Sequence, residues 1–344
     1  MFMGHRKKNS DNRDLHQQAY DRMKRMQHFG DSKTEDKKYD REHDTDTMSG
    51  KIYSYTTYET YWKHIKYFIQ YVKKHDPECK KLDKAKKYVP EWLQIRVVEG
   101  KSAWTIQTEA AALNKLYGIK KDDPQRFQPP RRNKEDIVRS RGAKERDKHF
   151  SERKNEELVN FCKGCGFRRN VLEKLKGSDL YDRRQVEASL KDARMQADYP
   201  RIKACKDALE TFPDKEYFIL HRKDKGGKTR LSPIVGPHTD KIVQRMKDTK
   251  PDELVWGYVS QNCDVHGYRS DYATYLYREY ARPIDSLNFK NKIRCADGKY
   301  RSEIYMCRGD EKGKKLDRKA IGVISIALGH NREDTAICNY IRNL

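Results

Sequence analysis

A polar connector near the middle of the sequence constrains the fold most strongly, because it cannot be buried in a core. It runs from 119 to 148 as IKKDDPQRFQPPRRNKEDIVRSRGAKERDK, with eleven Lys or Arg residues, six acidic residues and a Pro-Pro step. We therefore expect a folded domain on each side of it, and 344 residues are enough to give each domain its own core.

The residues before the connector predict a small helical domain over 52–118. TTYETYWKHIKYFIQYVKKH repeats apolar residues at three- and four-residue spacing, as an amphipathic helix requires. Two further helices each close on a glycine suited to a left-handed C-cap, Gly100 and Gly118. Residues 1–50 are polar with one weak helical stretch, so we expect a basic, flexible arm there.

The residues after the connector, 149–344, alternate helical patterns with short hairpins. EYFILHRKDKGGKTRLSPIV predicts a hairpin around its Gly-Gly step, and KIRCADGKYRSEIYMCRG predicts a second one that turns at Asp297-Gly298. Asp317 is placed to N-cap a helix in DRKAIGVISIALG. The fold class is therefore mainly α with short β-hairpins (α+β).

The formal charge is +23, from 75 Lys and Arg against 52 Asp and Glu. A field of this sign favours a polyanionic partner, with nucleic acid ahead of an acidic membrane surface. No run of about 18 apolar residues predicts a membrane span, and the first residues lack the apolar core of a signal peptide. We expect a cytoplasmic protein, in which the connector is either a solvated linker or a segment passing along DNA.

The eight cysteines lack the spacing of a disulfide framework, which indicates reduced thiols. CKGC (Cys162, Cys165) has metal-like spacing, and Cys295 with Cys307 would have to complete a zinc site. Small buried apolar side chains are the simpler interpretation, so we expect no metal.

The sequence ends in ALGHNREDTAICNYIRNL, with His330 and Tyr340 ten residues apart. This segment fits a plain amphipathic helix with Ile326, Ala336, Ile337 and Tyr340 on its inner side. The alternative is that His330 and Tyr340 perform chemistry.

Four further residues are equally ambiguous one by one. Arg168 in GCGFRRNVLEKL suits a surface cation, and Lys225 in KDKGGKTR suits an ordinary turn lysine. His266 and Arg269 in HGYRSDYAT lie three apart, on one face of a helix. In this order, followed by LGH and a tyrosine, the motifs over 150–344 resemble the tyrosine recombinases, the phage-integrase family. EGKSAWTIQTEAAALNKLYG is similar to that family's core-binding (SAM-like) domain.

The resemblance implies DNA strand cleavage without a metal or a cofactor. Arg168 and Arg269 would neutralise the non-bridging phosphate oxygens, since guanidiniums form forked hydrogen bonds and keep their proton at neutral pH. Lys225 would protonate the 5′-hydroxyl leaving group as a general acid. These three residues would form the cationic part of the catalytic site.

The remaining residues would carry the covalent step. Tyr340 would attack the phosphate and form a 3′-phosphotyrosine, which stores the bond energy for resealing. His266 would help to remove its proton, and His330 would donate a hydrogen bond to a phosphate oxygen. The implied function is a site-specific recombinase that integrates or excises a mobile element, working as a homo-tetramer on paired double-stranded DNA sites in the cytoplasm, at the nucleoid.

Two alternatives stay open on the sequence. A type IB topoisomerase shares the tyrosine chemistry, and a non-catalytic DNA-binding regulator could keep a recombinase scaffold. The sequence also departs from the family at several points. Val171 stands where an acidic residue is usual, 180–216 is a long helical insertion, and 61 positions separate Arg269 from His330. Four residues follow Tyr340, too few for the family's frequent C-terminal docking helix.

Overall fold

The computed structural model describes residues 13–124, 126–133, 149–224, 227–295, 298–308, 311–330 and 333–341, without the side chains of 223, 334 and 338. The chain divides into two compact units, Met1–Arg132 and Asn133–Leu344. The described parts are mainly helical with short antiparallel strand pairs, which confirms the predicted fold class. In these parts no helix is both long and apolar enough to cross a membrane.

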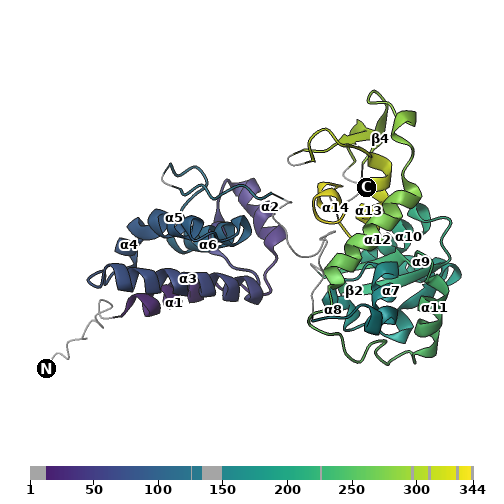
Figure 1. Cartoon of the computed structure of the whole chain (residues 1–344), viewed down its shortest axis with the longest axis horizontal. Helices are drawn as coiled ribbons and strands as arrows, with labels where there is room; N and C mark the ends of the chain where they lie inside the picture. The colour runs from purple at the N-terminus through teal and green to yellow at the C-terminus, as the bar shows by residue number, and fades with distance from the viewer. Residues whose placement is uncertain are drawn as a thin grey trace. The chain divides into compact units, whose positions relative to one another are not determined.

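The described part of the first unit is a helical bundle (Figure 1). Its helices are α1 (Leu15–Arg25), α2 (Lys33–His43), α3 (Tyr55–His75), α4 (Leu82–Ala85), α5 (Val89–Val98) and α6 (Ala103–Tyr117). α3 and α6 pack together, and their apolar residues recur once per turn on the buried face, as in Ile65, Phe68, Ile69 and Val72. α6 ends at Gly118 in the left-handed conformation, as the sequence predicts.

Within the polar segment before 50, α1 packs into the core of this bundle, in contrast to the expected flexible arm. Leu15, Ala19 and Met23 form one buried stripe of α1 at four-residue spacing. Gln18 is also tied to the loop before α4, since its side-chain amide donates to the carbonyl of Lys80 (2.8 Å) and accepts from the amide of Leu82 (2.9 Å). Only three residues of α1 are buried, so the polar composition of the segment did not indicate a core helix. Residues 1–12 lie outside the described residues.

The start of the predicted connector also packs onto the first unit. Phe127 lies against the helical core, and Gln107 of α6 donates to the carbonyl of Pro130 (2.9 Å). The connector is not fully solvated here, because burial of the Phe127 ring holds it against the helices. The rest of the connector, 134–148, lies outside the described residues.

The second unit holds eight α-helices and seven short strands in its described part. The helices are α7 (Glu156–Cys165), α8 (Arg169–Leu172), α9 (Arg183–Met195), α10 (Tyr199–Thr211), α11 (Thr239–Asp248), α12 (Val265–Tyr280), α13 (Arg318–Ala327) and α14 (Glu333–Asn339). The strands are β1 (Leu180–Asp182), β2 (Tyr217–Asp224), β3 (Lys228–Pro233), β4 (Lys292–Arg294), β5 (Tyr300–Ser302), β6 (Ile304–Met306) and β7 (Lys315–Asp317).

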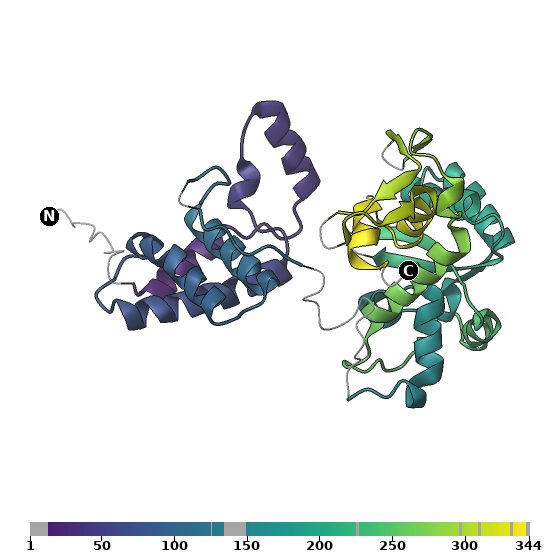
Figure 2. The same ribbon diagram turned by 45° about the horizontal axis from the view of Figure 1, so that its top comes forward.

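α12 crosses the middle of this unit and separates two apolar clusters (Figures 1 and 2). Tyr268 on one side packs with α7, α8 and α11, and Tyr272 on the other packs with α10, α13 and α14. β1, β2 and β3 form an antiparallel sheet beside them, with His221 of β2 paired to Arg230 of β3. α9 and α10 build the predicted helical insertion.

Both predicted hairpins exist as antiparallel strand pairs, β2 with β3 and β4 with β5. Gly227 and Gly298 adopt positive φ at the two turns, whereas Gly226 and Asp297 lie outside the described residues. Asp317 N-caps α13 as predicted, accepting from the amide of Lys319 (2.9 Å).

We expect Met23→Ala to lower the free energy of unfolding of the first unit by about 2–5 kcal/mol, because its side chain is fully buried and its loss leaves a cavity. Chemical denaturation followed by circular dichroism measures this change. Met195→Ala is the matched control, since Met195 of α9 is 71% exposed. Equal losses in the two variants would contradict the placement of α1 in the core.

Candidate functional site

The first site residue is positioned by a glycine turn after α7. Gly166 adopts φ +63°, and a β-carbon there would lie 2.3 Å from the ring of Tyr272. The chain then enters the core at Phe167 and turns into α8, with Arg168 at its N-cap. The Arg168 side chain is 18% exposed and forms an ion pair with Asp224, at the end of β2.

The neighbouring Arg169 has a structural task instead. Its guanidinium donates to the carbonyls of Ser260 (3.0 Å) and Cys263 (2.6 Å), and so fixes the loop that leads into α12. Of the two adjacent arginines, Arg168 is therefore the one available to a ligand.

The start of α12 carries two predicted site residues, His266 and Arg269. Asp264 caps the helix by accepting from the amide of Gly267 (2.9 Å). Arg269 is fully buried and donates to the carbonyls of Gly166 and Leu328, the latter at 2.6 Å. Because Gly166 directly precedes the turn to Arg168, this bond holds the two guanidiniums near each other.

The turn after α13 positions His330. Gly329 has φ +67°, and a β-carbon there would lie 2.7 Å from Cδ of Arg230. The His330 amide donates to the carbonyl of Ser325 (2.7 Å), whose hydroxyl donates to the carbonyl of His330 (3.2 Å). A side chain at 329 would displace the arginine, so the glycine of the Leu-Gly-His motif is a steric requirement of this turn.

Tyr340, directly after α14, lies at the centre of these residues. Its ring centroid is 5.1 Å from that of His266, 5.3 Å from that of His330 and 5.2 Å from Cζ of Arg269. Tyr340 is 4% exposed and belongs to the apolar cluster that also holds Ile337. The segment is therefore an amphipathic helix, as one interpretation predicted, and it also places the Tyr340 phenol beside His266, His330 and Arg269.

The structure thus gathers His266, Arg269, His330 and Tyr340, and ties Arg168 to them through Gly166. Lys225 lies outside the described residues, between Asp224 and the turn at Gly227. Val171 is buried in the apolar cluster that Tyr268 forms with α7, α8 and α11. No carboxylate could stay charged in that position without a partner.

Sequence reasoning missed three buried polar residues beside the site, namely His221, Asp224 and Arg230. Their exposed fractions are 0%, 2% and 6%. The Asp224 carboxylate pairs with both Arg168 and Arg230. No sequence signal set them apart from the many other polar residues, since the direct pairing of His221 with Arg230 across the hairpin is a property of the fold.

The cluster carries an excess of positive charge. Arg168 and Arg230 share the carboxylate of Asp224, whereas Arg269 donates to the backbone carbonyls of Gly166 and Leu328. Burial and the neighbouring Arg230 lower the pKa of Arg269 to about 9. Burial and the three guanidiniums lower the pKa of His330 to about 3, so its imidazole is neutral at neutral pH.

Two buried nitrogens in this cluster have no hydrogen-bond partner among the described residues: Nε of Arg269 and Nε2 of His330. Unsatisfied buried donors cost free energy, and a ligand oxygen would satisfy them. The excess cationic charge and the two nitrogens without a hydrogen-bond partner both fit an anion that offers several oxygens.

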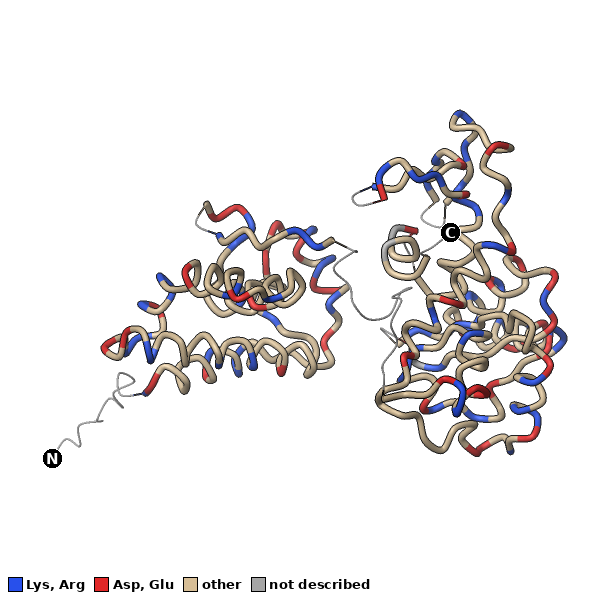
Figure 3. The backbone as a smooth tube through the Cα atoms, in the orientation of Figure 1, with Lys and Arg blue, Asp and Glu red and all other residues tan. Residues whose placement is uncertain are grey.

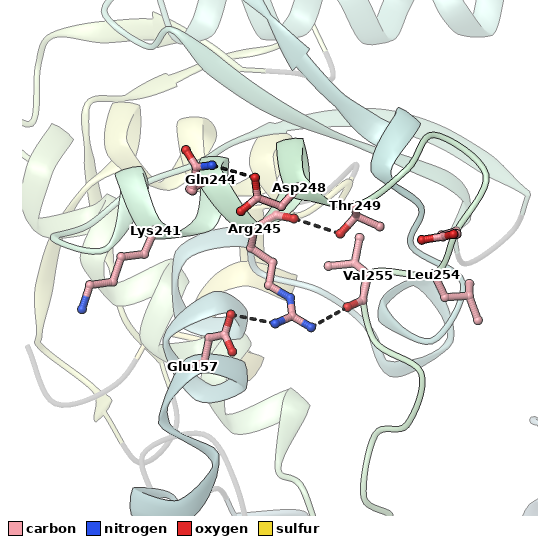
Figure 4. Close-up of a pocket in the computed structure, with 9 residues that line it drawn as sticks. Glu157, Lys241, Gln244, Arg245, Asp248, Thr249, Leu254 and Val255 are labelled. Atoms are coloured by element: carbon pink, nitrogen blue, oxygen red, sulfur yellow. Dashed lines mark hydrogen bonds and ion pairs between the residues drawn. The ribbon is translucent and has the colours of Figure 1, made fainter.

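A separate hollow of about 580 Å³ lies over α11 (Figure 4). Its central guanidinium, on Arg245, already donates to Glu157 (2.9 Å) and to the carbonyl of Val255 (2.9 Å), and it stacks on Trp256. None of the five predicted site residues that the structure describes lines it. It is therefore a surface groove braced by an ion pair, separate from the cationic cluster.

The cysteines raised as zinc ligands are distributed over two places. Cys162 and Cys165 are buried in α7, where burial raises the pKa of both thiols. Cys295 and Cys307 lie near the β4–β7 strands. The described residues contain no group of three or more His, Cys, Asp or Glu side chains that could hold a metal ion.

No protein-family model matches the sequence, and no curated protein matches it. Among solved structures, the crystal structure of XerA recombinase aligns with 94% of this chain and 94% of that chain, at 16% sequence identity and a TM-score of 0.25. A likeness of this degree does not assign a function. The assignment has to come from the residues themselves.

We expect His330→Asn to flatten the acid side of the stability profile. The unfolded chain protonates this histidine near pH 6.5, whereas the folded chain keeps it neutral to about pH 3. The free energy of unfolding should therefore fall as the pH drops through this window, by at most about 1.4 kcal/mol per pH unit for one histidine. Urea denaturation between pH 7 and pH 4.5 measures the difference. Parallel profiles for parent and variant would contradict a neutral His330.

Proposed function

We propose that this protein is a site-specific DNA recombinase that cleaves and rejoins strands through a 3′-phosphotyrosine on Tyr340. The observation that supports this most directly is the packing of the Tyr340 ring against Arg269, His266 and His330 in a buried cationic cluster. The guanidiniums next to the phenol can stabilise the negative charge that builds on the phosphate during attack, and the product phosphate stays next to the same cations.

The clamp role of the arginines follows from the charge count. Phosphodiester exchange builds negative charge on the non-bridging oxygens, and guanidiniums stabilise it by forked hydrogen bonds. Arg168 is 18% exposed, and the buried Nε of Arg269 has no hydrogen-bond partner among the described residues. Neutral His330 can donate one hydrogen bond without adding charge, as the proposed role requires.

His266 is assigned to the removal of the Tyr340 proton, because the two rings are in contact distance. Lys225 keeps its proposed role as general acid for the 5′-hydroxyl. Its position in the chain supports this, since it follows Asp224, which pairs with Arg168. These assignments complete a reaction in which each proton has a donor and an acceptor.

The proposed partner is double-stranded DNA. The chain carries a formal charge of +23, and Lys and Arg residues are spread over both units (Figure 3). Most of the affinity should come from phosphate contacts and should decrease steeply with salt. We assign the helical unit to DNA binding and the second unit to catalysis, in a homo-tetramer on paired sites that integrates or excises a mobile element.

A covalent adduct tests the proposal. We expect the parent to form a protein–DNA adduct, stable in detergent, with nicked duplexes that carry the DNA flanking its own gene. Tyr340→Phe should abolish the adduct and keep DNA binding, because the lost hydroxyl is the nucleophile. Denaturing gel electrophoresis of labelled DNA measures this loss.

Tyr300→Phe is the matched control, since Tyr300 is 67% exposed on β5. Tight binding to every duplex without any adduct would favour a non-catalytic regulator. Relaxation of any supercoiled plasmid without recombination would favour a type IB topoisomerase.

We also expect Tyr340 to attack DNA bound by its own subunit. α14 packs against α13 of the same chain, with Ile337 and the following Ile341 in the shared apolar cluster, and five residues separate the two helices. Moving Tyr340 to a neighbouring subunit would expose this apolar face.

Mixing two inactive variants tests this expectation. Arg168→Ala lacks one part of the clamp and Tyr340→Phe lacks the nucleophile, so neither variant alone should form adducts. Attack within one subunit predicts no adduct from the mixture either. Adducts restored in the mixture would show that the tyrosine of one subunit serves the clamp of another.

A further inference from the structure

One carboxylate oxygen joins two cations of the cluster. Oδ2 of Asp224 accepts from Nε of Arg230 (3.1 Å) and also forms the ion pair with Nη1 of Arg168. The side chain of Asp224 is 2% exposed and that of Arg230 is 7% exposed. Charge-assisted hydrogen bonds in such a dry place are strong and directional, so this oxygen fixes the relative position of both guanidiniums.

All three nitrogens of Arg230 are in use. Besides Nε, its Nη2 lies 2.8 Å from Nδ1 of His221, and its Nη1 donates to the carbonyl of Ala327. The last bond reaches the C-terminal turn of α13, three residues before His330. Arg230 is thus a structural link from the hairpin to the histidine, whereas Arg168 is 18% exposed and pairs with Asp224 alone among the ion pairs of the described residues.

His221 completes the link in one defined tautomer. Burial and Arg230 lower its pKa well below the ordinary value, so the ring is neutral. Nδ1 then accepts from Arg230, and Nε2 donates to the hydroxyl of Ser232 (2.6 Å), which donates to the carbonyl of Cys165 (3.3 Å). This chain of bonds ends next to the Gly166 turn that leads to Arg168.

We infer that Asp224 is a positioning residue for the cleavage reaction: through Arg168 directly, and through Arg230 and the α13 turn, it sets the places of the phosphate clamp and of His330. The expected effect on cleavage rests on the proposed function. The expected effect on the position of the arginines can be measured in the protein without DNA. The alternative is that Asp224 occupies the anion place and is displaced when DNA binds.

Asp224→Asn removes the charge at nearly constant size. Asp179→Asn is the matched control, because Asp179 is also a buried carboxylate (3% exposed) paired with an arginine, Arg222. Asp179 does not bind the clamp. Melting temperatures of both variants show whether each remains folded.

The first readout needs no DNA. In the ¹⁵N-labelled full-length protein, the Nε–H signal of Arg230, assigned by its loss in Arg230→Lys, should exchange slowly with water. Asp224→Asn should speed this exchange at least about tenfold, because the acceptor charge is lost, and Asp179→Asn should leave it unchanged. Unchanged exchange in Asp224→Asn would overturn the inference even if the protein never cleaves DNA.

The second readout is single-turnover adduct formation. A positioning role predicts a cleavage rate about 100-fold lower in Asp224→Asn with DNA affinity within about threefold of the parent, since one misplaced guanidinium affects the transition state more than binding. A faster cleavage rate and tighter binding would identify Asp224 as an occupant of the anion place and overturn the inference. Absence of adducts in the parent would count against the proposed function, and the exchange readout would still decide the role of Asp224.

Discussion

Two buried guanidiniums at the end of α13 hold the second unit's site together. The last carbonyls of a helix have no partner within the helix, and they carry the negative end of its dipole. Arg230 donates to Ala327 and Arg269 donates to Leu328, so a strand and a central helix meet at one turn. His330 follows immediately, and its position therefore depends on both.

The same arrangement makes the free protein electrostatically unfavourable at this point. Each guanidinium lowers the pKa of its neighbours, which is visible in Arg269 and in His330. Asp224 offsets part of the repulsion, and an anionic ligand would offset the rest. A site that is under-compensated when empty gains more from a phosphate than from a neutral ligand, and this gain increases as charge builds in the transition state.

The sequence predicted the fold class and both hairpins, because each rests on a local pattern of period or turn. The gathering of His266, Arg269, His330 and Tyr340 was implied by the family resemblance, since no local pattern brings such distant residues together. The helical stretch of α1 was predicted, but its packing into the core was not, because its three-residue stripe is surrounded by polar residues and Gln18 contacts a loop some sixty residues away. Asp224 and Arg230 could not be singled out in a chain with 37% charged residues. Their importance comes from burial, which is a tertiary property.

The long segment between α12 and α13 adds a brace to the helix that carries Tyr340. At its base, Arg282 pairs with Asp317 (2.9 Å), the residue that caps α13, and with Glu303 (3.0 Å). The next residue, Arg318, pairs with Glu333 at the start of α14 (2.5 Å). The two ends of the segment between α12 and α13 are therefore held together where α13 begins. The first turn of α14 is attached at the same point. α14 is short and follows α13 after five residues, so this second attachment helps to fix its direction. The extra length before α13 therefore supports the placement of the Tyr340 phenol.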